Sequence, residues 1–410
     1  MKILFATSKI NEHGGGIASY AIDFLKEFQD ENEFLVISSD DLNDKYSRLA
    51  PNYKKLDPES ISYFDGINLL RIIHEYKPDL IINSNFKLLS LILPYVKTNI
   101  LKISISHFID GKLAIVAGFN HKYYNAIVTL SEAGKRQLNH YYPNINKKKI
   151  EVIYNFFRPA SSNSHKGEEE LDNITKIVFP GGANPHKNPL LVFKVVRKLI
   201  KMELKFKFIW LGDTLLPGAK FLGKRYISDQ IKKDDRLEFT GTINRELAVK
   251  IIRNADIFLL PSKKEGCPIT LLEAMSAGTI PIVSDSKHAS SEIIRHEYNG
   301  FVLSASQVTD YLNLITDIIE KPQYYKEIRN NCYNSFHQFY TAELWKLKMS
   351  DLFTSRIDIL SDQINYSKSH FYRSRWILQI RLIWVRLIRI FTSLHYAIIF
   401  FIYRIAFKSY

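Results

Sequence analysis

Two glutamates stand eight positions apart in a stretch of apolar and small residues. The stretch, PSKKEGCPITLLEAMSAGTIPIVSD, contains Glu265 and Glu273. The preceding IFLLPS is predicted as a buried strand, Pro268 can begin a helix, and Gly278 stands where a glycine would end it. Because helical side chains lean toward the helix N-terminus, both carboxylates are expected to reach one cleft. Such a pair suits the hydroxyls of a sugar or a ribose, and two ordinary exposed glutamates are the alternative.

A second loop combines glycines, a lysine and a predicted helix start. In PGGANPHKNPLL, Gly181 and Gly182 precede Lys187, and Pro189 suits the first helical position after an Asn188 cap. Unpaired N–H groups and the helix dipole favour an anion there, and the lysine adds a positive charge. This pattern predicts a phosphate site, with a solvated loop lysine as the alternative.

Two further positions stand where strands are predicted to end. A glycine run, Gly14, Gly15 and Gly16, follows the first strand and allows a backbone to approach a ligand, although a plain tight turn fits equally well. His107 ends the strand ILKISIS, where a histidine serves structure more often than chemistry.

The elements that must position these residues alternate between strand and helix. KILFAT, FLVISS, DLIINSN, ILKISIS, AIVTLS and IEVIYN are short apolar runs, and IASYAIDFLKEF has the 3.6-residue period of a helix. After the polar segment SSNSHKGEEELDN the rhythm restarts with KIVFPGG, KFIWLGD, RLEFTG, DIFLLPS and IPIVSD. We therefore predict an α/β chain of two tandem Rossmann-like, doubly wound domains facing a ligand cleft.

The predicted boundaries follow these changes of pattern. They are 1–160 for an N-terminal Rossmann-like domain, 161–174 for a linker, 175–340 for a C-terminal Rossmann-like domain, 341–365 for a crossover helix, and 366–410 for a basic amphipathic tail.

Composition narrows the protein class. At 410 residues, 46% of them hydrophobic, the chain is long enough for two globular domains, and its net charge of +14 suits anionic partners. Its two cysteines, Cys267 and Cys332, have neither CxxC spacing nor a nearby histidine, so we expect no disulfide framework and no zinc site. The N-terminus lacks the apolar core of a signal peptide, which favours a cytosolic protein.

Taken together, these motifs resemble one family. EGCPITLLEAMSAG is similar to the E-x7-E signature of the retaining family 4 glycosyltransferases, which have the GT-B fold. PGGANPHKN resembles the second phosphate motif of that family, GGGIASY its N-terminal glycine loop, and IEVIYNFF the passage that closes its first domain. The resemblance extends over roughly residues 1–345.

The resemblance implies a role for each candidate residue. Glu273 would hold the ribose hydroxyls of a nucleotide sugar, Glu265 the hydroxyls of its sugar, and Lys187 would neutralise the diphosphate. His107 would lie near the reacting carbon. The remaining donor contacts would come from Gly15, Gly16, Gly181, Gly182, Gly266, Cys267 and Ile269.

One position departs from the family pattern. Many members have an arginine after the first glycine of the phosphate motif, where this chain has Gly182. His186 or an arginine elsewhere would then have to supply the second positive charge. Asp-x-Asp, the divalent-metal signature of the other large glycosyltransferase fold, does not occur, so we expect metal-independent transfer without a cofactor.

The tail has its own chemistry. Residues 366–410 contain eight Lys or Arg and no Asp or Glu, which is +8 of the net +14. Four arginines, Arg375, Arg386, Arg389 and Arg404, fall on nearly one helical face, and the longest uncharged run is too short to span a bilayer. We expect the tail to lie on an anionic membrane surface, with packing against protein as the alternative and no nucleic-acid motif beside it.

These expectations combine into one function. The chain is predicted to transfer a sugar from a UDP-sugar to a lipid-linked or growing glycan acceptor in cell-surface polysaccharide biosynthesis, peripheral on the cytoplasmic face of the plasma membrane. Two alternatives share the fold, namely a phosphorylase or nucleotide-sugar epimerase and a non-catalytic sugar-nucleotide binder. A pyridoxal-phosphate phosphorylase would need a Schiff-base lysine, and neither Lys263 nor Lys264 has a convincing context.

Overall fold

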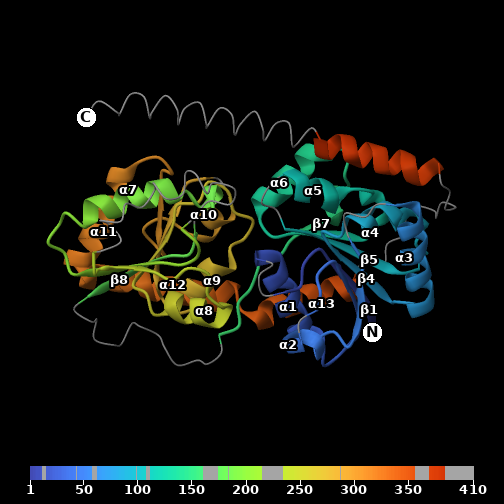
Figure 1. Cartoon of the computed structure of the whole chain (residues 1–410), viewed down its shortest axis with the longest axis horizontal. Coiled ribbons are helices and arrows are strands. Elements are labelled where there is room, and N and C mark those ends of the chain that lie inside the picture. The colour runs from blue at the N-terminus through green and yellow to red at the C-terminus, as the bar shows by residue number, and fades with distance from the viewer. Residues whose placement is uncertain are drawn as a thin grey trace.

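A computed structural model of the chain shows two α/β domains side by side, each built on its own parallel sheet (Figure 1). The structure describes residues 1–11, 15–42, 44–57, 62–97, 99–107, 111–159, 174–182, 184–214, 234–286, 288–355 and 369–383. The predicted linker 161–174 lies outside these ranges except for its last residue.

The N-terminal domain contains a seven-stranded sheet in the order β3-β2-β1-β4-β5-β6-β7, and every pairing is parallel. Its strands are β1 (Lys2–Thr7), β2 (Glu33–Ser38), β3 (Asn52–Lys55), β4 (Leu80–Ser84), β5 (Leu101–Ser106), β6 (Ala126–Thr129) and β7 (Ile150–Val152). Its helices are α1 (Gly15–Phe28), α2 (Asp44–Ser47), α3 (Tyr63–Tyr76), α4 (Lys87–Ile92), α5 (Gly111–Gly118) and α6 (Glu132–Tyr141).

The C-terminal domain repeats this architecture with six parallel strands in the order β10-β9-β8-β11-β12-β13. The strands are β8 (Thr175–Phe179), β9 (Phe206–Trp210), β10 (Leu237–Phe239), β11 (Ile257–Leu260), β12 (Ile280–Ser284) and β13 (Phe301–Leu303). The helices are α7 (Pro189–Leu199), α8 (Arg245–Arg253), α9 (Ile269–Met275), α10 (Ala289–Ile293), α11 (Val308–Glu320) and α12 (Lys326–Phe339). The prediction of two doubly wound domains is confirmed.

Local sequence explains most of these elements. The central strands are apolar runs that the sheet buries on both faces, as parallel sheets covered by helices require. In α1 the predicted apolar positions Tyr20, Ala21, Phe24, Leu25 and Phe28 are buried. The edge strand β3 has the polar sequence NYKK and was not predicted, because three of its four residues are exposed and they form no apolar run.

A crossing of the chain ties the two domains together. After the C-terminal domain, α13 (Ala342–Ser355) lies beside α1 in the N-terminal domain (Figure 1), where Lys346 Nζ is 2.6 Å from Glu31 Oε1. The indole of Trp345 stacks on Phe156 with ring centroids 4.0 Å apart. One buried apolar cluster consequently extends through both domains and includes residues of α1, α9 and α13. The sequence had placed a crossover helix in this part of the chain, within residues 341–365.

A final described helix, residues 369–383, packs on the N-terminal domain. Phe371, Leu378 and Leu382 are buried in the cluster that also contains Leu69 and Ile73 of α3. The predicted tail therefore begins with a helix that contacts the protein's own surface. No helix in the described ranges is long and apolar enough to cross a bilayer.

Candidate active site

The two glutamates lie at the carboxyl edge of the C-terminal sheet, where β8 and β11 are neighbours and the strand order reverses. Crevices at such a reversal are where doubly wound sheets bind ligands. Glu265 is in the loop after β11, and Glu273 is in α9, which begins directly after Pro268. Both side chains are buried, with residue exposures of 7% and 3%. The alternative of two exposed glutamates is therefore wrong.

Lys187 and Glu265 form an ion pair in which Nζ lies 2.7 Å from Oε1. The lysine side chain is 21% exposed and the carboxylate 9%. A backbone hydrogen bond fixes the two loops to each other, because Lys263 N–H donates to the carbonyl of His186 at 2.7 Å. The fold thus brings the predicted phosphate loop and the first glutamate to one place.

The glycine pair before this lysine has a geometric explanation. Gly182 has φ +51°, in the left-handed region, and a Cβ there would lie 3.1 Å from the carbonyl oxygen of Asp213. Its N–H donates to Leu211 O at 2.9 Å, so the backbone has no room to retreat. An arginine at Gly182 would therefore be strained in this backbone. A Cβ on Gly181 would come too close to the ring of Phe179, so that ring would have to move.

One detail of the loop differs from the prediction. Asn188 stands at the start of α7 before Pro189, but its side chain makes no capping hydrogen bond. Its backbone is left-handed (φ +58°), and its Nδ2 instead donates to Ala305 O at 2.9 Å. Asn188 therefore occupies the predicted N-cap position, but it does not cap the helix with its side chain, because its left-handed backbone turns that side chain away from the first N–H groups.

Glu273 has a partner that the sequence did not reveal. Arg245, the first residue of α8, places Nη2 3.6 Å from Glu273 Oε1. The same guanidinium donates two hydrogen bonds to Asp23 of α1, with Nη1 to Oδ1 at 2.9 Å and Nη2 to Oδ2 at 2.8 Å. An arginine of the C-terminal domain thus contacts a carboxylate of each domain. No local pattern marks this cluster, since its members are 222 residues apart.

Burial decides the protonation of Glu273. Removal of the carboxylate from water raises its pKa from 4.5 to about 7, against the opposing effect of Arg245, and the charge of Asp23 adds to the rise. Near neutral pH the carboxyl group is therefore divided between its charged and neutral forms. In the neutral form it can donate as well as accept a hydrogen bond.

His107 lies just after β5, at the carboxyl edge of the N-terminal sheet. It is 4% exposed, its Nε2 is 2.8 Å from Ser84 Oγ, and Tyr20 meets its ring edge-on at 4.7 Å. Burial lowers the pKa of His107 to about 3, so the imidazole is neutral at physiological pH. A neutral ring in this place can exchange hydrogen bonds but carries no charge.

The other predicted donor residues divide into two groups. Gly15 and Gly16 begin α1 and are exposed, with open space around the position of a Cβ at each. Gly266, Cys267 and Ile269 are buried in the approach to α9. The Cys267 thiol has a pKa raised to about 12 by burial, which leaves it unreactive.

Further contacts join the domains beside these residues. Asn155 Nδ2 donates to Cys267 O at 2.6 Å. Glu292 of α10 accepts the N–H groups of Glu132 and Ala133 at the start of α6, at 2.9 and 2.7 Å, and Arg136 Nη2 at 2.9 Å. Glu292 therefore stabilises the N-terminus of a helix in the opposite domain. Sequence reasoning missed this contact, because an isolated glutamate in ASSEI gives no signal.

The structure gives no metal cluster within the described ranges: no group of three or more His, Cys, Asp or Glu is placed to hold an ion. Of the four tail arginines, Arg375 lies 5.9 Å from the ring centroid of Tyr372. The other three, Arg386, Arg389 and Arg404, lie outside the described residues.

Comparison with known families agrees with this geometry. Residues 14–161 match the family Glycosyltransferase Family 4, and residues 161–335 match Glycosyl transferases group 1. The chain belongs to glycosyltransferase family 4.

Curated relatives within this family are distant. The chain is 27% identical over 203 residues to the UDP-Gal:alpha-D-GlcNAc-diphosphoundecaprenol alpha-1,3-galactosyltransferase of Escherichia coli, covering 46% of this chain and 51% of the relative. It is 31% identical over 158 residues to the N,N'-diacetylbacillosaminyl-diphospho-undecaprenol alpha-1,3-N-acetylgalactosaminyltransferase of Campylobacter jejuni, covering 37% and 40%. The chain thus spans about half the length of the curated relatives it matches.

Solved structures of other proteins share this fold. Anabaena HepE in complex with UDP-glucose superposes with a TM-score of 0.69 and 16% identity, over 87% of this chain and 100% of HepE. The lipopolysaccharide outer core galactosyltransferase WaaB superposes with a TM-score of 0.65 and 19% identity, over 87% and 99%. The predicted GT-B fold is confirmed.

Proposed function

We propose that this chain transfers a sugar, with retention of configuration, from a UDP-sugar to a lipid-linked or growing glycan acceptor. The names of two relatives support this proposal, since both act on diphosphoundecaprenol-linked acceptors and one uses UDP-galactose. HepE, which shares the fold, binds UDP-glucose. Cell-surface polysaccharide biosynthesis is the process that such acceptors serve.

The donor is proposed to lie along the carboxyl edge of the C-terminal sheet. Glu273 would bind the ribose hydroxyls and Glu265 the hydroxyls of the transferred sugar. Gly181, Gly182 and the backbone from Gly266 to Ile269 would lie along the diphosphate between them. The ion pair of Lys187 with Glu265 supports this order, because it holds a cation within 2.7 Å of the proposed sugar contact.

Departure of the nucleoside diphosphate requires positive charge. Lys187 would neutralise the developing charge on the leaving phosphate, which is the main way such a site lowers the barrier. We assign the second charge to Arg245, which lies 3.6 Å from Glu273 and can exchange Asp23 for a phosphate oxygen. In this proposal the two side-chain cations stabilise the leaving diphosphate, and no metal ion takes part.

The acceptor is proposed to enter from the N-terminal domain. Gly15 and Gly16, exposed at the start of α1, would lie against the phosphate or the acceptor. The neutral His107 would exchange a hydrogen bond with a hydroxyl near the reacting carbon. Retention follows if the acceptor hydroxyl attacks on the face from which the diphosphate leaves, with that diphosphate accepting its proton.

Attachment to a membrane would bring the enzyme to a lipid-linked acceptor. The tail is proposed to lie on the anionic cytoplasmic face of the plasma membrane, because its eight cations have no acidic neighbours in residues 366–410. Of the described helix 369–383, Trp376 is 67% exposed and is available to an interface.

The partly buried Lys187–Glu265 ion pair, at the same edge of the C-terminal sheet as the buried Glu273, is the observation that carries the proposal. The test is a thermal-shift panel of UDP-glucose, UDP-galactose, UDP-N-acetylglucosamine and GDP-mannose with the full chain. A matching donor at about 100 times its Kd should raise Tm by about 3 °C. Glu273→Ala should abolish that shift.

Release of UDP from the identified donor is then measured in three variants. Glu265→Ala and Lys187→Ala should each reduce the rate by about 100-fold or more. Lys194→Ala, which removes an exposed lysine of α7, is the matched control and should release UDP at the wild-type rate. Unchanged release in both site variants would contradict the assignment.

A further inference from the structure

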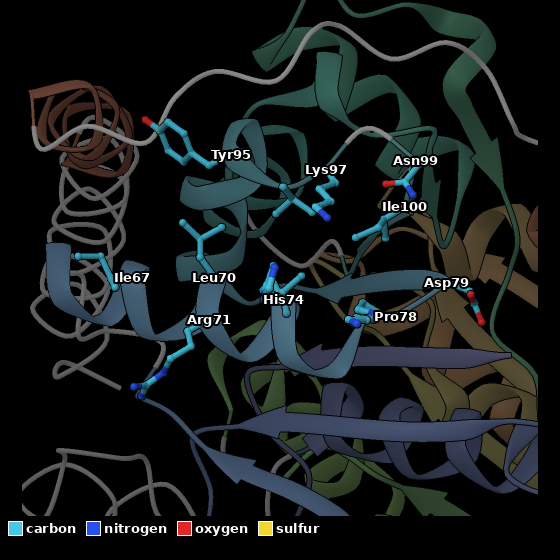
Figure 2. Close-up of a pocket in the computed structure, with 13 residues that line it drawn as sticks. Ile67, Leu70, Arg71, His74, Pro78, Asp79, Tyr95, Lys97, Asn99 and Ile100 are labelled. Atoms are coloured by element: carbon cyan, nitrogen blue, oxygen red, sulfur yellow. The ribbon is translucent and has the colours of Figure 1, made fainter.

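A cavity of 610 Å³ lies in the N-terminal domain, at the amino ends of β4 and β5. Figure 2 shows side chains of α3 on one side of it and those of Tyr95, Lys97, Asn99 and Ile100 on the other. The candidate active site is at the carboxyl ends of the strands, which is the opposite edge of the sheet. The cavity is therefore a separate feature, and its volume is in the range of about 300–1,000 Å³ common for small-molecule sites.

The cavity combines apolar walls with cationic side chains. Leu70 and Ile73 of α3, together with Ile100, supply apolar surface. Three cations line it as well, namely Arg71, Lys77 and Lys97, all on exposed residues (Figure 2 labels Arg71 and Lys97). Such a pairing suits a ligand with an anionic group and an apolar part.

Acidic groups offset this charge only in part. Asp79 lines the cavity, but its Oδ2 accepts the backbone N–H of Lys2 at 2.8 Å. Glu75, on the same helix as Arg71, lies 4.0 Å from that guanidinium, a distance at which an exposed pair contributes little. A net positive charge therefore remains among the residues that line the cavity.

A buried lysine adds to the positive potential of one wall. Lys102 of β5 is 1% exposed, and its Nζ donates to the carbonyls of Lys97 and Ile100 at 2.6 and 3.0 Å. Burial lowers its pKa to about 8, so the ammonium is still mostly charged at pH 7. No carboxylate pairs with it among the residues that the structure describes. The segment that forms the wall is thus fixed from behind by an unneutralised cation.

Exposed apolar side chains surround the same part of the domain. Ile67 of α3 lines the cavity and is 42% exposed, and Phe64, one turn earlier, is 76% exposed. Tyr63 contacts both Phe64 and Phe371, with ring centroids 5.9 and 6.0 Å apart, which brings helix 369–383 to this end of α3. Trp376 of that helix is also exposed. Apolar side chains exposed beside cations are typical of a surface that meets a lipid interface.

We propose that this cavity binds the headgroup of an anionic membrane phospholipid, with the first part of its acyl chains against Leu70, Ile73 and Ile100. Lys97 contacts the phosphate, and Arg71 and Lys77 add positive charge around the cavity, where the Arg71 guanidinium donates to Asn68 Oδ1 at 2.8 Å. The bound lipid is an anchor and not the acceptor, because the cavity is at the sheet edge opposite the cleft. The inference rests on the proposed membrane attachment and does not depend on sugar transfer.

The test uses the full chain and a soluble short-chain lipid. Dihexanoyl phosphatidylglycerol, below its micelle concentration, is titrated by calorimetry, with dihexanoyl phosphatidylcholine and glycerol 3-phosphate as comparisons. We expect one phosphatidylglycerol molecule to bind per chain. The Kd of each comparison ligand should be higher by about ten-fold or more. Lys97→Glu should weaken binding about ten-fold or more, and Leu70→Trp should block the cavity. Equal binding of the anionic and zwitterionic lipids would overturn the proposal.

A second measurement uses vesicles of phosphatidylcholine and phosphatidylglycerol at 3:1. The variant Arg71→Glu/Lys77→Glu/Lys97→Glu should lose about 100-fold in partitioning. Arg197→Glu/Lys198→Glu/Lys201→Glu makes the same change of charge on exposed residues of the C-terminal domain and should lose less than about three-fold. Equal losses in the two variants would overturn the proposal and indicate diffuse electrostatic attraction. No loss in either variant would overturn it as well and indicate binding by the tail alone.

Donor chemistry is measured in parallel on the same proteins. The cavity variants should release UDP at the wild-type rate, which also shows that they are folded. If no variant and no wild-type chain releases UDP while cavity-dependent lipid binding persists, the proposed glycosyl transfer fails and the lipid site stands.

Discussion

Glu273 should make this protein less stable as the pH rises, because its carboxyl group is harder to ionise in the folded protein than in the unfolded chain. The change to test is Glu273→Gln, which keeps the shape and removes the charge. Burial raises the pKa of Glu273 from 4.5 to about 7, whereas in the unfolded chain the group ionises near its ordinary value. Between these two values the folded state binds the extra proton, so folding is favoured at low pH and stability falls as the pH increases.

The size of the effect follows from the two pKa values. A difference between 4.5 and about 7 corresponds to a free energy of about 3 kcal/mol, present below the unfolded pKa and fully lost above the folded one. A glutamine does not ionise, so its contribution to the free energy of unfolding does not change with pH. The free energy of unfolding of Glu273→Gln, taken relative to that of the wild type, should therefore increase by about 2–3 kcal/mol from pH 5 to pH 8. Arg245 keeps its two hydrogen bonds to Asp23 in the variant, so the comparison isolates one carboxylate.

Urea denaturation at pH 5, 6, 7 and 8 measures this difference. Glu246→Gln is the control, since this neighbouring glutamate has an 81% exposed side chain. Its free energy of unfolding should follow the wild type within about 0.5 kcal/mol at every pH. In parallel, Glu273→Gln should bind the UDP-sugar more weakly, because a neutral amide accepts weaker hydrogen bonds from the ribose.

A pH-independent difference between Glu273→Gln and the wild type would refute the raised pKa. A variant that becomes relatively less stable as the pH rises would refute it more strongly, since that is the sign of a carboxylate stabilised by Arg245. Agreement would mean that a residue unfavourable for folding is kept at the candidate active site for binding.

Three further outcomes are expected. Lys187→Met should cost about 2 kcal/mol in urea denaturation by leaving Glu265 unpaired, and adding Glu265→Gln should recover stability without recovering UDP release. Asp23→Asn should weaken the hydrogen bonds to Arg245 and so lower the Kd for UDP about five-fold, as measured by calorimetry. Weaker UDP binding would contradict the proposal that Arg245 exchanges Asp23 for a phosphate oxygen. Gly182→Ala should lose about 2 kcal/mol in urea denaturation, whereas Gly241→Ala, with φ +63° and open space, should lose about 1 kcal/mol. Equal losses would mean that the Asp213 contact is unimportant.

The sequence by itself determined the α/β class, most strands and the residue types of the candidate active site. The reason is that these signals are local. Apolar runs and 3.6-residue periods predict strands and helices, and a glycine loop with a lysine predicts a phosphate site from a dozen neighbouring residues. The stretch around Glu265 and Glu273 was informative because its motif residues stand close together in the sequence and because its resemblance to the family is specific.

Only the tertiary structure decided how these residues are paired. Asp23 and Glu273 come from different domains, and no spacing in the chain indicates that both contact Arg245. The edge strand β3 and the contact of Glu292 with α6 were likewise hidden, because a polar strand and a lone glutamate have no distinguishing pattern. Burial, which sets the pKa of Glu273 and joins charged groups across the cleft, depends on the packing of both domains and not on any one segment.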